Sequence, residues 1–145
     1  MATDLDLNEL AKVSHLFEAL DAQGRKALIA LSHKIHVKDG EVIFREGDPG
    51  GEFYVIAHGE VRVTADGLDG EKEIARLGHS QFFGEMAVLN GDRRTATCTA
   101  VGEVDLVAFP LVAVEKILSQ YPAAREALHK VGVLRTEDIL QKIME

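Results

Sequence analysis

The sequence predicts an α+β protein built around an eight-stranded antiparallel β-roll of jelly-roll-like form, with helices before and after it. Three observations lead to this fold class. Apolar residues recur at helical spacing over residues 7–33, at every second position over residues 34–109, and at helical spacing again over residues 110–143. Glycine-containing turns separate the alternating runs at short intervals, as in β-rolls and barrels. No linker interrupts the chain, so we expect one domain over residues 1–145.

The N-terminal segment is predicted to be helical. Apolar side chains spaced by three and four residues from Leu7 to Leu20 indicate one amphipathic helix or two short ones. Asp21 is a plausible N-cap for a further helix that extends through Leu28, although Gly24 weakens its first turn.

Short antiparallel strands are predicted next, because the apolar period changes to two at Lys34. Turns that contain Gly40, residues 47–50 and residues 58–59 separate the first of these strands. The alternating runs cover residues 35–37, 42–44, 53–57, 61–63, 74–77, 97–101 and 104–109.

The chain is predicted to close with two helices. Pro110 suits the first position of a helix, and the dipeptide Tyr121-Pro122 ends that helix. A last helix follows from Ala123 to Ile143, with Gly132 as a weak point.

Composition argues against several classes of function. Hydrophobic residues make up 46% of the chain, and 16 basic against 24 acidic residues give a net charge of −8. This balance disfavours sequence-independent binding to nucleic acid or to an anionic membrane. We expect no signal peptide, no membrane span and a cytoplasmic location. The lone Cys98 is expected to be a packed strand thiol with no catalytic role.

Residues 82–97 predict a site for a compact anion. Gly84 lets backbone approach a ligand closely, and the turn from Gly84 to Ala87 would leave N–H groups unpaired at the start of a short apolar helix. Arg94 supplies a guanidinium fork that can bind two oxygens of one phosphate.

Glu85 adds information about the ligand. A carboxylate inside an anion-binding turn repels the anion unless it accepts a hydrogen bond from another donor, and a ribose hydroxyl is such a donor. A phosphate beside a sugar hydroxyl describes a cyclic nucleotide better than a free phosphate. The alternative is that Glu85 and Arg94 pair with each other in an ordinary β-domain, and the spacing alone does not choose between the two interpretations.

A family resemblance bears on that choice. The run Phe83-Gly84-Glu85-Met86-Ala87, followed by Gly91-x-x-Arg94-Thr95-Ala96-Thr97, resembles the phosphate-binding cassette of the cyclic nucleotide-binding domain. This module occurs in the catabolite activator protein, in the regulatory subunit of protein kinase A, and in cyclic nucleotide-gated and hyperpolarisation-activated channels. The resemblance extends over roughly residues 10–143 and implies a β-roll with an inserted cassette, a cyclic purine nucleotide as ligand, and no cofactor or catalytic residue. The ligand-binding residues that it implies in and beside the cassette are Phe83, Gly84, Glu85, Met86, Ala87, Arg94, Thr95 and Ala96.

The resemblance to the channel domains also implies contacts with the base. Val63, Ala75 and Leu77 match strand positions against which the base lies, and they suit a plain core equally well. Arg135 and Ile139 match two residues of the last helix that close over the base, and their spacing of four places them on one helical face. The alternative is a solvated Arg135 and an Ile139 that packs on the roll.

Thr95 bears on the choice of nucleotide. Alanine at this position is typical of kinase-type sites that prefer cAMP, whereas a threonine hydroxyl can bind the amino group of guanine. Channel domains with Arg-Thr bind both nucleotides, so we expect cAMP to be favoured and cGMP to be possible. Binding is expected to move the C-terminal helix and to act on an unidentified protein partner or oligomer.

Three other functions are weighed against this one. A cupin-like metalloenzyme needs His-x-His, but His33 and His36 would point to opposite faces of a strand, so we expect no enzyme and no metal site. A DNA-binding regulator needs a helix-turn-helix after the long helix, which is not expected before Glu145. A ligand-silent interaction module is disfavoured because Glu85 and Arg94 are both present.

Overall fold

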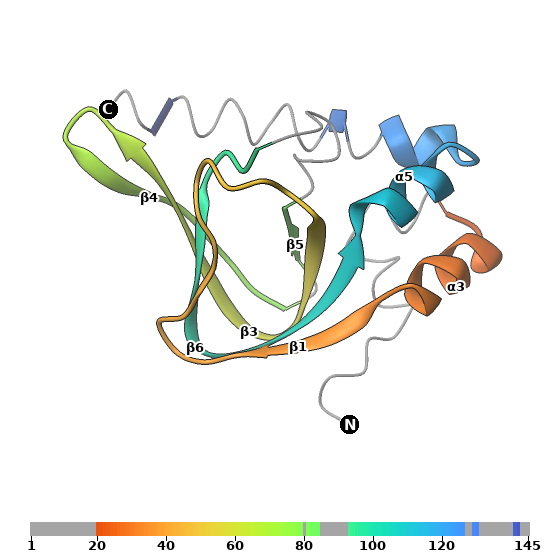
Figure 1. Cartoon of the computed structure of the whole chain (residues 1–145), viewed down its shortest axis with the longest axis horizontal. Helices are drawn as coiled ribbons and strands as arrows, with labels where there is room; N and C mark the ends of the chain where they lie inside the picture. Colours follow the sequence, from red (N-terminus) through yellow and green to blue (C-terminus); the bar gives the residue numbers. More distant parts are fainter. Residues whose placement is uncertain (1–19, 80, 85–92, 127–128, 131–140, 143–145) are drawn as a thin grey trace.

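The fold is an antiparallel β-sheet protein with helices at one end (Figure 1). The computed structural model describes residues 20–79, 81–84, 93–126, 129–130 and 141–142. Their helices and strands are, in chain order, α3 (Ala22–Ala30), β1 (His33–Val37), β2 (Val42–Phe44), β3 (Glu52–Gly67), β4 (Gly70–Leu77), β5 (Phe82–Phe83), β6 (Thr97–Pro110) and α5 (Leu111–Leu118). Residues 122–126 are also helical.

The two long strands, β3 and β6, hold the sheet together. Strand order is β1-β6-β3-β4, β2 pairs with β6, β5 pairs with β3, and every pairing is antiparallel. The predicted antiparallel fold class is therefore confirmed, whereas the predicted count of eight strands is not. The part of the chain that the structure describes forms six strands.

Two glycines join runs that were predicted as separate strands. Predicted runs 53–57 and 61–63 are joined in β3, which continues through Gly59, and runs 97–101 and 104–109 are joined in β6, which continues through Gly102. Both glycines have positive φ, +102° and +74°, so they bend their strands without ending them. The register of β3 against β6 shifts on both sides of His58, as expected at a bulge.

The core forms on both faces of β3 because successive side chains point to opposite sides. Phe53, Val55 and Ala57 belong to the cluster that packs against α3 and α5, whereas Tyr54 and Ile56 belong to the cluster inside the roll. Strand β6 divides its side chains in the same way, with Phe109 toward the helices and Leu106 toward the interior. Cys98 is buried in the interior cluster, as predicted.

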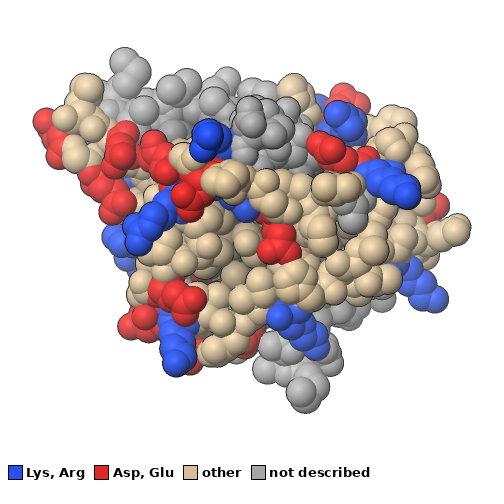
Figure 2. All heavy atoms as spheres, viewed as in Figure 1, with Lys and Arg blue, Asp and Glu red and all other residues tan. Residues whose placement is uncertain are grey.

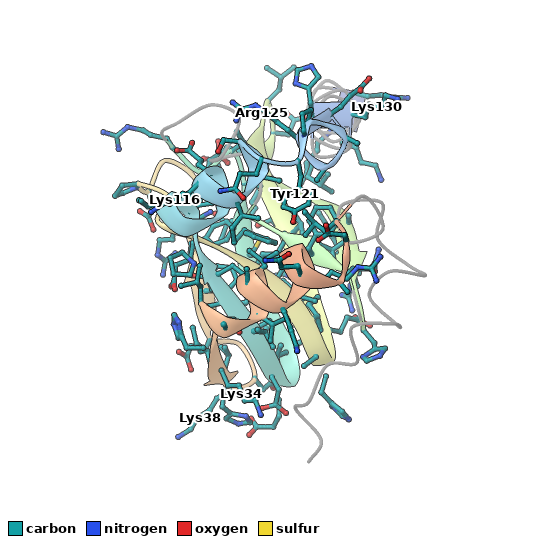
Figure 3. All side chains as sticks on the ribbon, turned by 90° about the vertical axis from the view of Figure 1, so that its right-hand side faces the viewer. Lys34, Lys38, Lys116, Tyr121, Arg125 and Lys130 are labelled. Carbon is teal, nitrogen blue, oxygen red and sulfur yellow. The ribbon has the colours of Figure 1, made fainter. Side chains whose placement is uncertain are left out.

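The start of α3 is fixed by a shared carboxylate. Asp21 caps the helix as predicted, because its Oδ1 accepts from the Gly24 amide at 2.7 Å, and the same oxygen accepts from the Tyr121 hydroxyl at 2.8 Å. These two hydrogen bonds, the Gly24 bond first, lower the pKa of Asp21. Gly24 was expected only to weaken the first turn of this helix. A Cβ at Gly24 would lie 2.8 Å from Tyr121 Cζ, so the absence of a side chain leaves space for the Tyr121 ring (Figure 3).

Helix α5 begins one residue later than predicted. Pro110 was expected at the first helical position, but it has ψ of 129° and still pairs with Glu52, so it ends β6 and caps α5. The extended backbone of Pro110 explains this shift, because strand pairing continues up to the residue before the helix.

No helix in the described part of the chain is long and apolar enough to cross a membrane.

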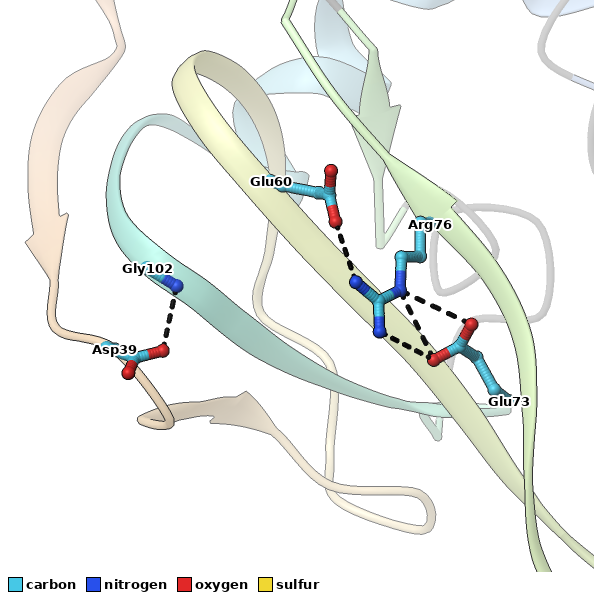
Figure 4. Close-up of polar contacts among 5 residues, drawn as sticks. All are labelled: Asp39, Glu60, Glu73, Arg76 and Gly102. Carbon is cyan, nitrogen blue, oxygen red and sulfur yellow. Dashed lines mark hydrogen bonds and ion pairs between the residues drawn. The ribbon is translucent and has the colours of Figure 1, made fainter.

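Surface charge is unevenly distributed over the roll. Figure 2 shows acidic side chains gathered over the hairpin between β3 and β4, where the exposed acidic residues are Asp66, Asp69, Glu71 and Glu73. Arg76 lies on the same strand pair and bonds to Glu60 at 3.1 Å and to Glu73 at 3.3 Å (Figure 4). Exposed pairs of this kind add little to stability.

A histidine with two acidic partners connects β1 to the bend in β6. His36 Nδ1 lies 2.8 Å from Asp105 Oδ1, and His36 Nε2 lies 2.9 Å from Glu103 Oε1. Asp39 holds the same bend by accepting from the Gly102 amide at 2.8 Å (Figure 4). The hydrogen bonds to Asp105 and then Glu103 raise the pKa of His36, and the bond from His36 lowers the pKa of Glu103.

We expect Gly59→Ala to destabilise the roll more than Gly102→Ala. Both substitutions strain a positive φ, but a Cβ at Gly59 would lie 2.6 Å from the Glu103 carbonyl oxygen, whereas a Cβ at Gly102 meets nothing within 4 Å. The backbone strain and the clash together predict a loss of about 2–4 kcal/mol for Gly59→Ala against about 1–2 kcal/mol for Gly102→Ala. Urea unfolding followed by circular dichroism measures both. Equal losses would contradict the close approach of β3 and β6.

We also expect His36→Gln to reduce stability mainly at mildly acidic pH. The folded pKa of His36 is raised above 6.5, so protonated His36 stabilises the fold below that pH, and the contribution is lost as pH rises through the folded pKa. Glu103 contributes above its unfolded pKa of 4.5 and loses its contribution as pH falls through its lower folded pKa. The melting temperatures of the wild type and of His36→Gln should therefore differ most between pH 4.5 and pH 6.5. The exposed His129→Gln is the control, and a difference independent of pH would disprove the ionic contribution.

Candidate functional site

The described part of the candidate site lies where β2, the start of β3, the end of β5 and the segment before β6 meet. Arg94 is fixed there by its backbone, since its amide donates to the Asp48 carbonyl at 2.8 Å and its carbonyl accepts from the Gly47 amide at 2.9 Å. The adjacent Arg93 donates from Nη1 to the Gly47 carbonyl at 2.8 Å. The turn after β2 and the segment that carries Arg94 therefore form one hydrogen-bonded unit.

The side chain of Arg94 is turned into the protein and is only 6% exposed. Its Nη1 donates to the Gly84 carbonyl at 3.1 Å, and its Nη2 donates to the Glu52 carbonyl at 2.7 Å. The guanidinium carbon lies 4.0 Å from the centre of the Phe44 ring. Among the described residues, the buried Nε has no hydrogen-bond partner.

The charge of Arg94 is therefore poorly compensated among the residues that the structure describes. Burial lowers its pKa, and the more distant charges of Glu52 and Asp48 offset this effect only in part. The two described acceptors of its terminal nitrogens are neutral backbone carbonyls. A buried cation with a free donor is a favourable place for an anionic acceptor, because electrostatic interactions are stronger away from bulk water.

Gly84 is required by this packing. It has φ of +87°, and a Cβ there would lie 2.9 Å from Arg94 Nη1 and 3.2 Å from the Glu52 carbonyl oxygen. The close approach expected of this glycine thus involves the Arg94 side chain and the β3 backbone. The structure brings Gly84 and Arg94 together, as the sequence predicted for parts of one site.

The other predicted residues of the cassette are placed in part. Phe83 is buried in β5, where it pairs with Tyr54 and stacks on its ring at 5.1 Å between centroids. Thr95 is half-buried and Ala96 is buried, and both follow Arg94 directly. The predicted residues outside the described part are Glu85, Met86, Ala87, Arg135 and Ile139. The alternative pairing of Glu85 with Arg94 also lies outside it.

The three residues expected against the base lie on neighbouring strands. Val63 of β3 is directly opposite Ala75 of β4 and Cys98 of β6. Leu77 is two residues farther along β4, opposite Val61, and it is buried in the interior cluster. Val63 packs against the same cluster, so Val63 and Leu77 contribute to the core whether or not a base contacts them.

Sequence reasoning missed Phe44 as part of the site. Its only signal was its place in a short alternating run of apolar residues, which predicts a core position. The contact with Arg94 depends on the bulged register that places Phe44 opposite Cys98. The Glu52 and Gly84 carbonyls were missed as well, because a backbone acceptor has no signature in the sequence.

The histidines do not form a metal site in the described part of the chain, where no group of three or more His, Cys, Asp or Glu residues could hold a metal ion. His33 lies 3.2 Å from the Glu52 carboxylate, and His36 pairs with acidic residues at the other end of β1. His79 Nδ1 lies 2.9 Å from the Ala57 carbonyl oxygen. Each of these three histidines thus has a local structural partner.

The chain is similar to known proteins over most of its length. A family model described as cyclic nucleotide-binding domain matches residues 34–121. The mouse cyclic nucleotide-gated channel alpha-4 is 31% identical over 138 residues, which cover 91% of this chain and 24% of the channel. The cAMP-dependent protein kinase regulatory subunit of Dictyostelium discoideum is 38% identical over 97 residues, or 64% of this chain and 29% of that subunit.

A solved structure extends the similarity to the fold. The catabolite activator protein of Thermus thermophilus superimposes with a TM-score of 0.75 at 28% identity, over 86% of this chain and 59% of that protein. The chain thus spans about a quarter of the length of the mouse channel, 24%, and a larger part of the bacterial regulator. The matched family model and these similarities show that the chain belongs to the cyclic nucleotide-binding domain family.

Proposed function

We propose that this chain is a sensor that binds a cyclic purine nucleotide, with Arg94 holding the cyclic phosphate. The observation that carries the proposal is the buried Arg94 guanidinium, whose Nε has no hydrogen-bond partner in the part of the chain that the structure describes. A guanidinium has five N–H donors, and Arg94 uses two of them on the carbonyls of Gly84 and Glu52. The phosphate of a cyclic nucleotide would supply the missing acceptor and the missing negative charge.

The rest of the proposed binding mode follows from the family resemblance. Glu85 accepts from the ribose 2′-hydroxyl, and backbone N–H groups from Gly84 to Ala87 complete the phosphate seat. Val63, Ala75 and Leu77 contact the base. The adjacency of Val63 and Ala75 across β3 and β4 supports this last assignment.

We propose cAMP as the favoured ligand and cGMP as a possible one, with Thr95 as the residue that adjusts the balance. The net charge of −8 makes local donors decisive, because the overall field of the protein repels an anion. The biological output passes through a protein partner or oligomer that the site does not identify. A module that binds no nucleotide remains the competing function.

Arg94→Ala should weaken binding of both nucleotides by about a hundredfold to a few thousandfold, since charge-assisted hydrogen bonds to the phosphate are lost. Isothermal titration with cAMP and with cGMP measures the loss and the preference of the wild type. Arg93→Ala is the matched control, because the neighbouring arginine is exposed and bonds only to the Gly47 carbonyl among the contacts described. Wild-type protein that binds neither nucleotide would establish the silent module, and an Arg94→Ala variant with full affinity would remove Arg94 from the site.

We further propose that nucleotide binding acts on the C-terminal helix through Arg135 and Ile139. A ligand can shift this helix only if one position of the helix binds it better, and contacts with the base would supply the difference. Backbone amides of residues 136–143 should therefore exchange more slowly with deuterium when cAMP is added. Arg94→Ala protein at the same cAMP concentration is the control. Identical exchange with and without ligand in the wild type would assign the signal to another surface.

A further inference from the structure

We propose that Phe44 is a positioning residue for nucleotide binding, because its ring holds the Arg94 guanidinium in the orientation that presents Nε to the phosphate. This Nε has no hydrogen-bond partner among the described residues. This inference rests on the proposed function and adds a residue to that site. Phe44 is the last residue of β2, and no resemblance or motif assigned it a part in binding. Three kinds of contact support the assignment.

The first contact is between the ring and the cation. The Arg94 guanidinium carbon lies 4.0 Å from the centre of the Phe44 ring, which places the charge over the face of the aromatic ring. An aromatic face carries a negative potential and attracts a cation within about 6 Å, more strongly where water is excluded. Arg94 is 6% exposed, so the interaction is largely shielded from solvent.

The second kind of contact fixes the edge of the guanidinium. The carbonyls of Gly84 and Glu52 accept from Nη1 and Nη2 at 3.1 and 2.7 Å, whereas the ring of Phe44 fixes the plane. Edge and plane together determine where the remaining donors of Arg94 point. An arginine ordered before binding loses less conformational freedom when the ligand arrives, which favours affinity.

The third kind of contact holds the platform itself. The Phe44 ring lies 6.1 Å from the Tyr54 ring and 5.8 Å from the Phe83 ring, and those two rings stack at 5.1 Å. Tyr54 is two residues after Glu52, and Phe83 directly precedes Gly84. The Glu52 carbonyl thus lies in the same strand as Tyr54, and the Gly84 carbonyl directly follows the strand that carries Phe83, so the ring and both acceptors are connected around Arg94.

The test compares Phe44→Leu with a conservative rescue. Phe44→Leu should weaken cAMP binding about 5- to 30-fold, which is the effect of a shielded cation–π contact of about 1–2 kcal/mol. Phe44→Tyr keeps the aromatic face and should bind within about threefold of the wild type. Ile43→Ala is the packing control, since Ile43 is a partly buried neighbour in β2 that packs against the same interior cluster. If Phe44→Leu does not fold, Phe44→Met replaces it, because methionine fills a similar volume without an aromatic face.

A double-mutant cycle separates positioning from general packing. In an Arg94→Ala background, Phe44→Leu should change cAMP affinity less than about twofold, since no guanidinium remains to be positioned. NMR titration measures these weak affinities.

A spectroscopic readout needs no ligand. The Phe44 ring should shield the Arg94 Nε–Hε proton, so the resonance of this proton should move downfield in Phe44→Leu but not in Ile43→Ala.

The outcomes distinguish this proposal from the proposed function. If wild-type protein binds neither cAMP nor cGMP, the proposed function is wrong and the positioning role is wrong with it. If the wild type binds and Arg94→Ala does not, an equal loss from Phe44→Leu and Ile43→Ala would overturn the role of Phe44 alone. The same conclusion would follow if Phe44→Leu weakened binding equally with and without Arg94.

Discussion

The pairing of β3 with β6 is the interaction on which the rest of the described structure depends. Strand β3 also pairs with β4 and β5, and β6 also pairs with β1 and β2, so every other strand is attached to one of these two. Their alternating side chains divide the apolar residues between the helices and the roll interior. Because a shift by one residue would exchange these two faces, the register of this single pair determines where the helices pack and where Arg94 is placed.

Arg94 is a buried cation in an acidic protein, and its immediate surroundings determine how it interacts. Arg94 lies inside a chain of net charge −8, and acidic side chains gather over the β3–β4 hairpin (Figure 2). Burial removes the guanidinium from water, so the groups that touch it affect its charge most strongly. Among the described residues, these groups are two carbonyl oxygens and one aromatic ring, none of which carries a charge. The positive charge of Arg94 therefore stays available for an ionic interaction with an anion.

Much of the architecture could be predicted from the sequence, because alternation of apolar residues and turn glycines are local signals. The cap at Asp21, the buried Cys98 and the antiparallel strands follow from such signals. Gly59 and Gly102 could not be interpreted correctly, since a glycine in an alternating run looks the same whether it ends a strand or bends it. Arg94 could be chosen from the sequence as a candidate anion-binding residue. Its carbonyl acceptors and its contact with Phe44 could not be predicted, because they are set by strand register.

The arrangement around Arg94 has a consequence for how the protein folds. The hydrogen bonds of this residue and of Arg93 join segments that are 42 and 46 residues apart in the chain. Closing loops of this length is slow compared with forming local structure, so the surroundings of Arg94 are complete only after the β2–β3 turn, β5 and the segment before β6 have assembled. A molecule that binds there recognises the native state and not the unfolded chain. By mass action, such a molecule stabilises the whole roll, and the stabilisation increases with its concentration relative to its Kd.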